Sequence, residues 1–448
     1  MRRAALIGAL VLLVVVAGAA WYLRPIAPIA TGYAAKLTCS GVFVSGRDAV
    51  DVERDLPPNP LVPLLRTTVD PSDGRVSTSL LGAWRSTAWV GADGCTLADE
   101  RPDLPVGGLD RPEVGDAPWP AGDGAPEPGD VDLADIEAAL DRAFSEDGTG
   151  DATRGTRAVV VAHQGRLVTE RYADGFDADT PLLGWSMGKS LANAVIGRLV
   201  AEGQLDLDDD QLRPEWADDE RGDITVRQLL QMTDGLAFEE VYDPDTDATR
   251  MLFLPGDTAA YAAAQPLAHP PGEVWAYRSG ATNLLCDLAQ ERSGLGTELV
   301  RELLFDPLGM RTALVEPDVT GTPVCSSFPY ATARDWARFG QLFLDDGVWD
   351  GERLLPDGWV GSSTEPVASA PAATPYGAQW WLNASPDGQL RMPSVPADAY
   401  WASGNEGQQV VVVPSADLVV VRLGLSEGFS GVDWGLEPLL ADVIAALP

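Results

Sequence analysis

An apolar run opens the chain, and periodic hydrophobic positions follow it. The run Ala4–Tyr22 spans 19 residues and follows Arg2 and Arg3. An apolar helix of that length can cross a bilayer, and it is long for a cleaved signal segment. We therefore expect residues 1–25 to form an uncleaved membrane anchor. This places the protein in the cell envelope, at the inner or cytoplasmic membrane, with the rest of the chain outside the cytoplasm.

Two regions of weaker pattern follow the anchor. Residues 26–105 contain short strand-like runs, including Gly41–Val44 and Ala83–Val90, which are broken by proline-rich turns. Residues 106–129 are dense in proline, glycine and aspartate and lack hydrophobic periodicity. We interpret the first region as an accessory layer and the second as a linker, with one large domain over 130–448.

The large domain has strand patterns at both ends and helical patterns between them. Two strand pairs are expected, at Ala158–His163 with Arg166–Tyr172 and at Gln409–Val413 with Leu418–Leu423. Helices are expected over Asp132–Phe144, Val226–Met232, Thr282–Arg292, Ala333–Leu344 and Leu436–Leu447. The pattern predicts an α+β fold, in which one antiparallel sheet built from both chain ends is packed by helices and accompanied by an all-helical subdomain.

Charge and residue usage narrow the chemistry. Acidic residues outnumber basic ones by 67 to 31, for a formal charge of -36. Such a chain repels phosphate backbones, so nucleic acid is excluded as a partner. The chain has only two lysines, Lys36 and Lys189, and two histidines, so a histidine-based metal cluster is not expected. We expect no cofactor, although the alternation Asp243, Asp245 and Asp247 leaves a calcium loop open.

One of the two lysines follows a serine at helical spacing. Ser186-Met187-Gly188-Lys189 begins a pattern in which Met187, Leu191 and Val195 recur every four residues. Residues three apart on a helix share a face, so both side chains lie within hydrogen-bonding range of each other. Burial and the helix N-terminus both lower the pKa of such a lysine, which could then act as a base for the serine. The alternative is an N-cap serine beside a lysine that reaches solvent.

Two later motifs favour catalysis. Tyr277-Arg278-Ser279 precedes a helical pattern, and its tyrosine supplies an acid or base in a site without histidine. The third motif contains Ser403, Gly404 and Asn405, whose small residues would let a backbone N–H approach a substrate carbonyl.

These three motifs, in this order, resemble those of the serine beta-lactamase and penicillin-binding-protein superfamily, in its class C and esterase-like branch. The Tyr-Arg-Ser form is most similar to 6-aminohexanoate-dimer hydrolases, and the resemblance covers about 130 to 448. It implies a beta-lactamase/transpeptidase-like fold, Ser186 as acylated nucleophile, and Lys189 and Tyr277 as the acid/base pair. It also implies an oxyanion hole from the backbone of Ser186 and Asn405, and a substrate contact through Tyr242.

The chain departs from that family at two positions. Ala402 stands where the third motif usually carries lysine or histidine. Ser279, which we also expect to contact substrate, stands where many relatives have asparagine. The pattern therefore favours esters or linear amides without an essential carboxylate over beta-lactams. Arg278 is the residue that would restore carboxylate recognition, whereas Trp185, Trp401 and Tyr242 would bind an apolar group.

The predicted function is therefore that of a serine hydrolase acting through an acyl-enzyme on a small-molecule ester or linear amide. The alternative is a non-catalytic or weakly active penicillin-binding-like protein that binds cell-wall peptides. Export would permit a disulfide, and we predict one between Cys39 and Cys95. Cys286 and Cys325 lie in apolar or turn-like contexts and are expected to be buried free thiols.

Overall fold

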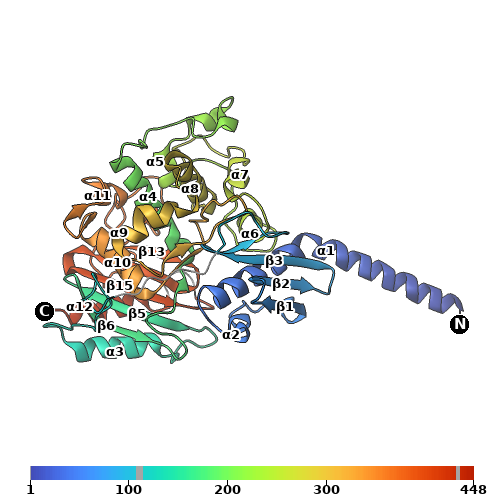
Figure 1. The fold of residues 1–448 in the computed structure, drawn as a ribbon, viewed down its shortest axis with the longest axis horizontal. Coiled ribbons are helices and arrows are strands. Elements are labelled where there is room, and N and C mark those ends of the chain that lie inside the picture. The colour runs from blue at the N-terminus through green and yellow to red at the C-terminus, as the bar shows by residue number, and fades with distance from the viewer. Residues whose placement is uncertain (1, 107–114, 430–433) are drawn as a thin grey trace.

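A six-stranded antiparallel sheet forms the centre of the large domain in the computed structural model, which describes residues 2–106, 115–429 and 434–448 (Figure 1). The strand order is β12-β13-β14-β15-β5-β6. The strands are β12 (Trp381–Leu382), β13 (Tyr400–Gly404), β14 (Gln408–Val413), β15 (Leu418–Gly424), β5 (Thr156–His163) and β6 (Arg166–Tyr172). Pairing of β15 with β5 joins the two ends of the domain, so the predicted sheet is confirmed.

Alternating side chains of this sheet build two cores, one on each face. Val159 and Val161 pack with α3 (Leu133–Phe144) and α12 (Leu436–Ala445). Val160 and Val419 pack on the other face, where α10 (Ala333–Leu344) crosses the sheet. Gly340 of α10 permits this close packing, because an added Cβ would lie 2.6 Å from Cγ1 of Val419.

Helices fill the chain between the two halves of the sheet, and they form the predicted helical subdomain. They are α4 (Gly188–Ala201), α5 (Val226–Leu230), α6 (Asp247–Phe253), α7 (Thr258–Ala263), α8 (Ser279–Ser293) and α9 (Asp306–Leu308). Smaller elements are α11 (Trp359–Ser363), β7 (Leu182–Leu183), β8 (Leu314–Val315), β9 (Pro329–Ala331), β10 (Val348–Trp349) and β11 (Glu352–Arg353). The mixed α/β class predicted from the sequence is confirmed.

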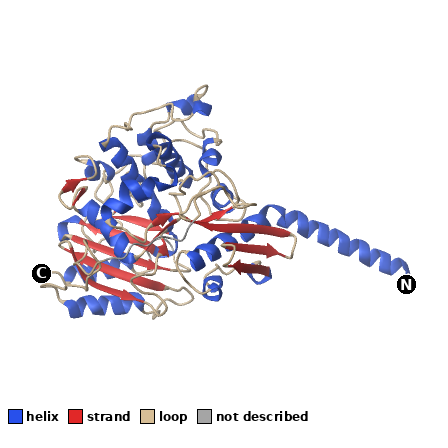
Figure 2. Cartoon of the chain, viewed as in Figure 1, coloured by secondary structure: helices blue, strands red, loops and turns tan. Residues whose placement is uncertain are grey.

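The accessory region forms its own sheet, which packs against a long helix (Figure 2). Its elements are α1 (Arg2–Phe43), α2 (Ala49–Arg54), β1 (Leu65–Asp70), β2 (Arg75–Leu80), β3 (Trp84–Gly91) and β4 (Gly94–Leu97). The four strands pair in chain order, β1-β2-β3-β4. Ala35 and Cys39 of α1 pack with Val76 and Ala88 of the sheet, which leaves the first half of the helix projecting from the body.

The N-terminal helix corrects the prediction of a membrane anchor. It does not end near Tyr22 but continues past Pro25 and Pro28 to Phe43, where it belongs to the accessory core. Among the residues that the structure describes, no helix combines the length and the apolar character needed to cross a membrane. The transmembrane anchor predicted over 1–25 is therefore wrong, and membrane attachment through it is unsupported.

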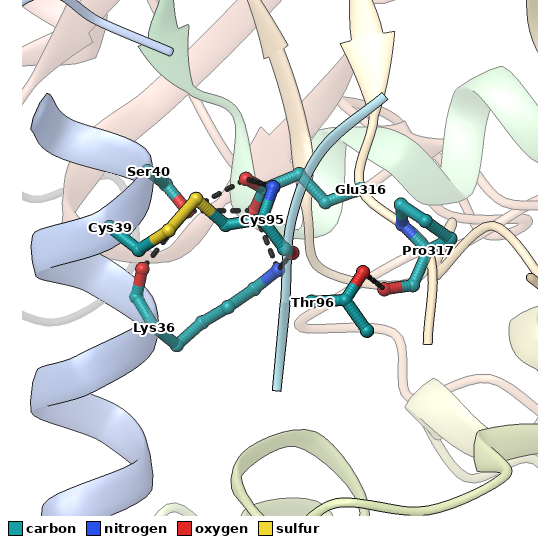
Figure 3. The surroundings of a disulfide bond; sticks show 7 residues. All are labelled: Lys36, Cys39, Ser40, Cys95, Thr96, Glu316 and Pro317. Carbon is teal, nitrogen blue, oxygen red and sulfur yellow. Dashed lines mark hydrogen bonds and ion pairs between the residues drawn. A yellow bond between two sulfur atoms is a disulfide. The ribbon is translucent and has the colours of Figure 1, made fainter. Parts of the chain in front are cut away.

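A buried polar cluster joins the accessory region to the large domain beside a disulfide (Figure 3). Cys39 of α1 and Cys95 of β4, the predicted pair, are linked by a disulfide with a Cα–Cα distance of 6.1 Å. Lys36 Nζ lies 2.8 Å from Glu316 Oε2, and both side chains are almost fully buried. Ser40 Oγ and the Cys95 N–H donate to the same carboxylate at 2.7 Å each. Burial lowers the pKa of Lys36 and raises that of Glu316, so each charge depends on its partner.

The described part of the linker lies along α10. Arg338 donates from Nε to the Pro120 carbonyl at 2.9 Å and from Nη2 to the Gly122 carbonyl at 2.8 Å. Trp119 is buried, and its indole N–H donates to the Arg334 carbonyl at 3.4 Å. This segment therefore covers the large domain, while positions 107–114 of the predicted linker lie outside the described residues.

Candidate active site

Ser186 lies in a short 3₁₀ turn, Trp185–Met187, that leads directly into α4. Trp185, the preceding residue, has φ of +49°, a strained value for a bulky side chain and one that recurs at functional sites. Gly188 lets α4 pass close to the neighbouring chain, because an added Cβ would lie 2.0 Å from the Cys325 carbonyl oxygen. The serine is thus held at the start of a helix that is buried along nearly its whole length.

Lys189 is 1% exposed, and its ammonium group contacts the serine directly. Its Nζ donates to Ser186 Oγ at 3.0 Å, to Ser279 Oγ at 3.0 Å and to the Ser326 carbonyl at 3.2 Å. Burial lowers the pKa of Lys189 to about 8, although the nearby charge of Glu240 opposes that shift. At that pKa about a tenth of the lysine is neutral at pH 7, and the neutral form is the one that can act as a base.

Tyr277 borders the same serine from the second motif. Its ring lies 4.6 Å from Lys189 Nζ and stands edge-on to Tyr376, with ring centroids 5.9 Å apart. Burial and the charge of Glu240 raise the pKa of Tyr277, although a side-chain hydrogen bond with Ser186 opposes the rise. The tyrosine therefore stays a phenol at neutral pH and can donate a proton.

Glu240 is the charged neighbour that sequence reasoning missed. Its Oε2 accepts the Ser279 backbone N–H at 2.7 Å, and its Oε1 accepts Ser279 Oγ at 2.6 Å. Ser279, predicted to contact substrate, instead connects this carboxylate to Lys189. A single glutamate in a loop carries no spacing signal, so only the fold reveals its place beside the lysine.

The third motif reaches Ser186 through its backbone. An added Cβ at Gly404 would lie 2.1 Å from the Gly184 carbonyl oxygen, so only glycine permits this approach of β13. Asn405 is the next residue in the chain, and it is exposed. The Ser403 hydroxyl accepts from Gln409 Nε2 at 3.0 Å and is committed to the neighbouring strand.

Two residues predicted to bind substrate are buried. Trp401 is fully buried in the core beneath α3 and α12, because successive side chains of β13 point to opposite faces and Ala402 takes the other one. Arg278 is 4% exposed and donates from Nη1 to Asp234 Oδ1 at 3.1 Å. The arginine is therefore engaged by a buried carboxylate.

Tyr242 and Trp185 are two further residues that the sequence predicts to bind substrate. Tyr242 is 44% exposed, and its hydroxyl donates to Glu240 Oε1 at 3.3 Å. The Trp185 indole is buried and donates to Glu406 Oε2 at 3.0 Å. Burial raises the pKa of Glu406 to about 7.

The prediction of free thiols at Cys286 and Cys325 is wrong, because a disulfide joins them with a Cα–Cα distance of 6.4 Å. Cys286 lies on α8 and Cys325 directly precedes Ser326, whose carbonyl accepts from Lys189. The bond thus ties the helix that follows Tyr277 to one of the contacts of the lysine. Folding of α8 against this distant loop creates the pairing, which the local sequence around each cysteine does not reveal.

Two of the three alternating aspartates make side-chain contacts within the protein. Asp245 pairs with Arg250 at 2.5 Å, and Asp247 accepts the Glu239 N–H at 2.9 Å. Within the described ranges, no three His, Cys, Asp or Glu side chains gather as they would around a metal ion.

Comparison with known proteins places these residues in a family context. The family model described as Beta-lactamase matches residues 140–432. A 6-aminohexanoate-dimer hydrolase of Paenarthrobacter ureafaciens is 29% identical over 319 residues, covering 65% of this chain and 79% of its own. A Bacillus anthracis structure assigned to the same activity has a TM-score of 0.56 at 26% identity, with 65% and 79% of the two chains covered. A family VIII carboxylesterase structure has a TM-score of 0.53 at 17% identity, covering 70% of this chain and 98% of its own, and shows the fold alone.

Proposed function

The chain belongs to the beta-lactamase family, and from that premise we propose that it hydrolyses esters or linear amides through an acyl-enzyme on Ser186, with Lys189 as the base. One observation carries the proposal. The buried Lys189 Nζ lies 3.0 Å from Ser186 Oγ, and burial lowers the pKa of the lysine to about 8. Hydrolase activity on ester or amide bonds agrees with the family and with its related dimer hydrolase.

Acylation begins with transfer of the Ser186 proton to neutral Lys189. The oxygen of the serine then bonds to the substrate carbonyl carbon, and the carbonyl electron pair moves to oxygen. The backbone N–H groups of Ser186 and Asn405 are the proposed donors to that oxyanion, where fixed donors act most strongly. Close approach of Gly404 to Gly184 supports this pairing, because it brings the third motif to the chain segment of the serine.

Collapse of the tetrahedral intermediate breaks the bond to the leaving group. Tyr277 is the proposed proton donor to that group, because its raised pKa keeps it protonated. The phenolate formed then recovers a proton from Lys189, which received one from the serine. Water enters for deacylation, and the same groups act in the reverse order.

The preferred substrate is proposed to lack an essential carboxylate near the scissile bond. Ala402 brings no charge to the third motif, and Arg278 is paired with buried Asp234. The excess of 67 acidic over 31 basic residues also slows the encounter with an anionic substrate at low salt.

We further propose that the protein works outside the cytoplasm. The two disulfides, Cys39–Cys95 and Cys286–Cys325, support this location, since such bonds persist mainly in oxidising compartments.

A panel of acyl esters, linear amides and penicillins tests the substrate proposal. Neutral esters or amides are expected to give the highest kcat/KM, with carboxylate-bearing analogues slower and beta-lactams turned over poorly. Ser186→Ala is the control for non-enzymatic hydrolysis. A preference of about tenfold or more for the acid analogue, worth about 1.4 kcal/mol in transition-state binding, would contradict the proposal, as would efficient penicillin hydrolysis. Binding of cell-wall peptides without turnover of any substrate would favour the non-catalytic alternative.

A further inference from the structure

A cavity of about 280 Å³ lies between the accessory region and the active site. One wall comes from α1 and the loop before β1, and the other comes from the large domain, including Trp185, Tyr242 and Asn405. The accessory wall lies outside residues 140–432, the part of the chain that the family model matches. The accessory side of the cavity is therefore built by a part of the chain that the family model does not cover.

One face of α1 lines the cavity. Its lining residues are Ile26, Ile29, Ala30, Tyr33 and Ala34. Positions separated by three, four, seven and eight residues lie on one face of a helix, so these five side chains form one apolar stripe that faces the cavity.

The helix is held closely against α6 at this point. An added Cβ at Gly32 would lie 1.9 Å from the Phe253 carbonyl oxygen, so the backbones touch only because Gly32 has no side chain. The rings of Tyr33 and Phe253 pack with centroids 4.7 Å apart. This part of α1 is thereby fixed against α6 of the large domain (Figure 1).

The lining selects for an uncharged, apolar occupant. Among the described residues that form it, none is a lysine or an arginine, and Glu406 is the only one with an ionisable carboxylate. Leu61 and Val62 extend the apolar wall from the accessory loop. An apolar cavity of about 150 Å³ holds one benzene ring, so this one has room for roughly eight to ten carbons.

The large-domain wall of the cavity includes residues next to or within the catalytic motifs. Trp185 directly precedes Ser186, and Asn405 belongs to the third motif. Tyr242 connects to Lys189 through Glu240 and Ser279 by successive hydrogen bonds of 3.3, 2.6 and 3.0 Å. The residue before the proposed nucleophile and the proposed oxyanion-hole residue therefore both line the cavity.

We propose that this cavity binds the apolar acyl group of the substrate, of about eight to ten carbons, while the acyl carbonyl lies at Ser186. The inference rests on the proposed function and extends it. It makes the accessory region a determinant of acyl-chain specificity.

Hydrolysis of p-nitrophenyl acetate and p-nitrophenyl octanoate tests the inference. The wild-type protein is expected to favour octanoate by about tenfold or more in kcat/KM. Ala30→Phe fills the cavity, and Ile26→Asn makes its α1 wall polar, so each is expected to bring the octanoate-to-acetate ratio close to one. Ala20→Phe places the same ring on an exposed position of α1 and is expected to keep the wild-type ratio.

Binding of methyl octanoate to Ser186→Ala, measured by calorimetry, separates the cavity from the chemistry. Ala30→Phe in that background is expected to weaken binding about tenfold, whereas Ala20→Phe leaves it unchanged. A wild-type ratio near one, or equal ratios in wild type and Ala30→Phe, overturns the inference. If Ser186→Ala hydrolyses the acetate as fast as wild type, the proposed function fails, and the calorimetric comparison still decides the inference.

Discussion

Lys189→Ala is expected to lower kcat/KM for a neutral ester by about 10³-fold, the middle of the range for general-base catalysis. Lys189 Nζ contacts Ser186 Oγ at 3.0 Å. Burial holds the pKa of the lysine at about 8, which suits it to accept the serine proton. Steady-state kinetics on the purified variant measures the loss. Lys189→Arg is the matched control: it keeps the charge but cannot release a proton, so it is expected to be as slow as the alanine variant.

The pH profile separates a base from a merely structural lysine. Because neutral Lys189 is the proposed reactive form, wild-type kcat/KM is expected to rise as pH increases through about 8, the pKa that burial gives this residue. Glu240→Gln removes the charge that raises this pKa, so the rise is expected to move to lower pH. The assignment of Lys189 as the base would be contradicted if Lys189→Ala kept more than about a tenth of wild-type kcat/KM, because loss of a base lowers the rate by about 10²-fold or more. It would also be contradicted if the pH profile of kcat/KM were the same in Glu240→Gln as in the wild type.

Lys36→Met is expected to lower the free energy of unfolding by about 3 to 5 kcal/mol, because it leaves the Glu316 carboxylate buried without its counter-ion. Chemical denaturation measures the loss. The deficit should shrink as pH falls towards the ordinary carboxyl pKa, since burial raises the pKa of Glu316 and protonation removes its charge.

Two further variants test whether the loss of stability in Lys36→Met comes from the unpaired buried charge. Arg54→Met breaks the exposed pair with Asp51, whose side chains are 72% and 55% accessible, and is expected to cost less than about 1 kcal/mol. Adding Glu316→Gln to Lys36→Met removes both buried charges and is expected to recover most of the stability. Two results would show that the Lys36–Glu316 pair does not hold the accessory region in place. One is a double variant that is as unstable as Lys36→Met, and the other is a Lys36→Met protein that is as stable as Arg54→Met.

Hydrophobic periodicity alone predicted the main strands and helices of the large domain. Alternating valines predicted the strands that became β14 and β15, and apolar residues four apart predicted α4 after Ser186. These patterns lie within short stretches of the chain, so a single sequence is enough to detect them. The same reasoning misjudged α1, because a hydropathy window from Ala4 to Tyr22 does not reveal that the helix runs on to Phe43 and into the accessory core.

Parts of the site that depend on tertiary contacts escaped sequence reasoning. Glu240 stands beside Lys189 only because its loop meets the N-terminus of α8. Arg278 looked available to a substrate, yet its partner Asp234 lies 44 residues away along the chain. Trp401 is adjacent to Ala402 in sequence but on the opposite face of β13. Each case required the pairing of distant segments, which a single sequence does not encode in its local pattern.

Ser186, activated by Lys189, is the proposed nucleophile. Peptide mass spectrometry after reaction with a fluorophosphonate identifies the residue that reacts. We expect one adduct, on the peptide that contains Ser186, and none on Ser186→Ala. An adduct on another residue, or equal labelling of Ser186→Ala, would contradict the account.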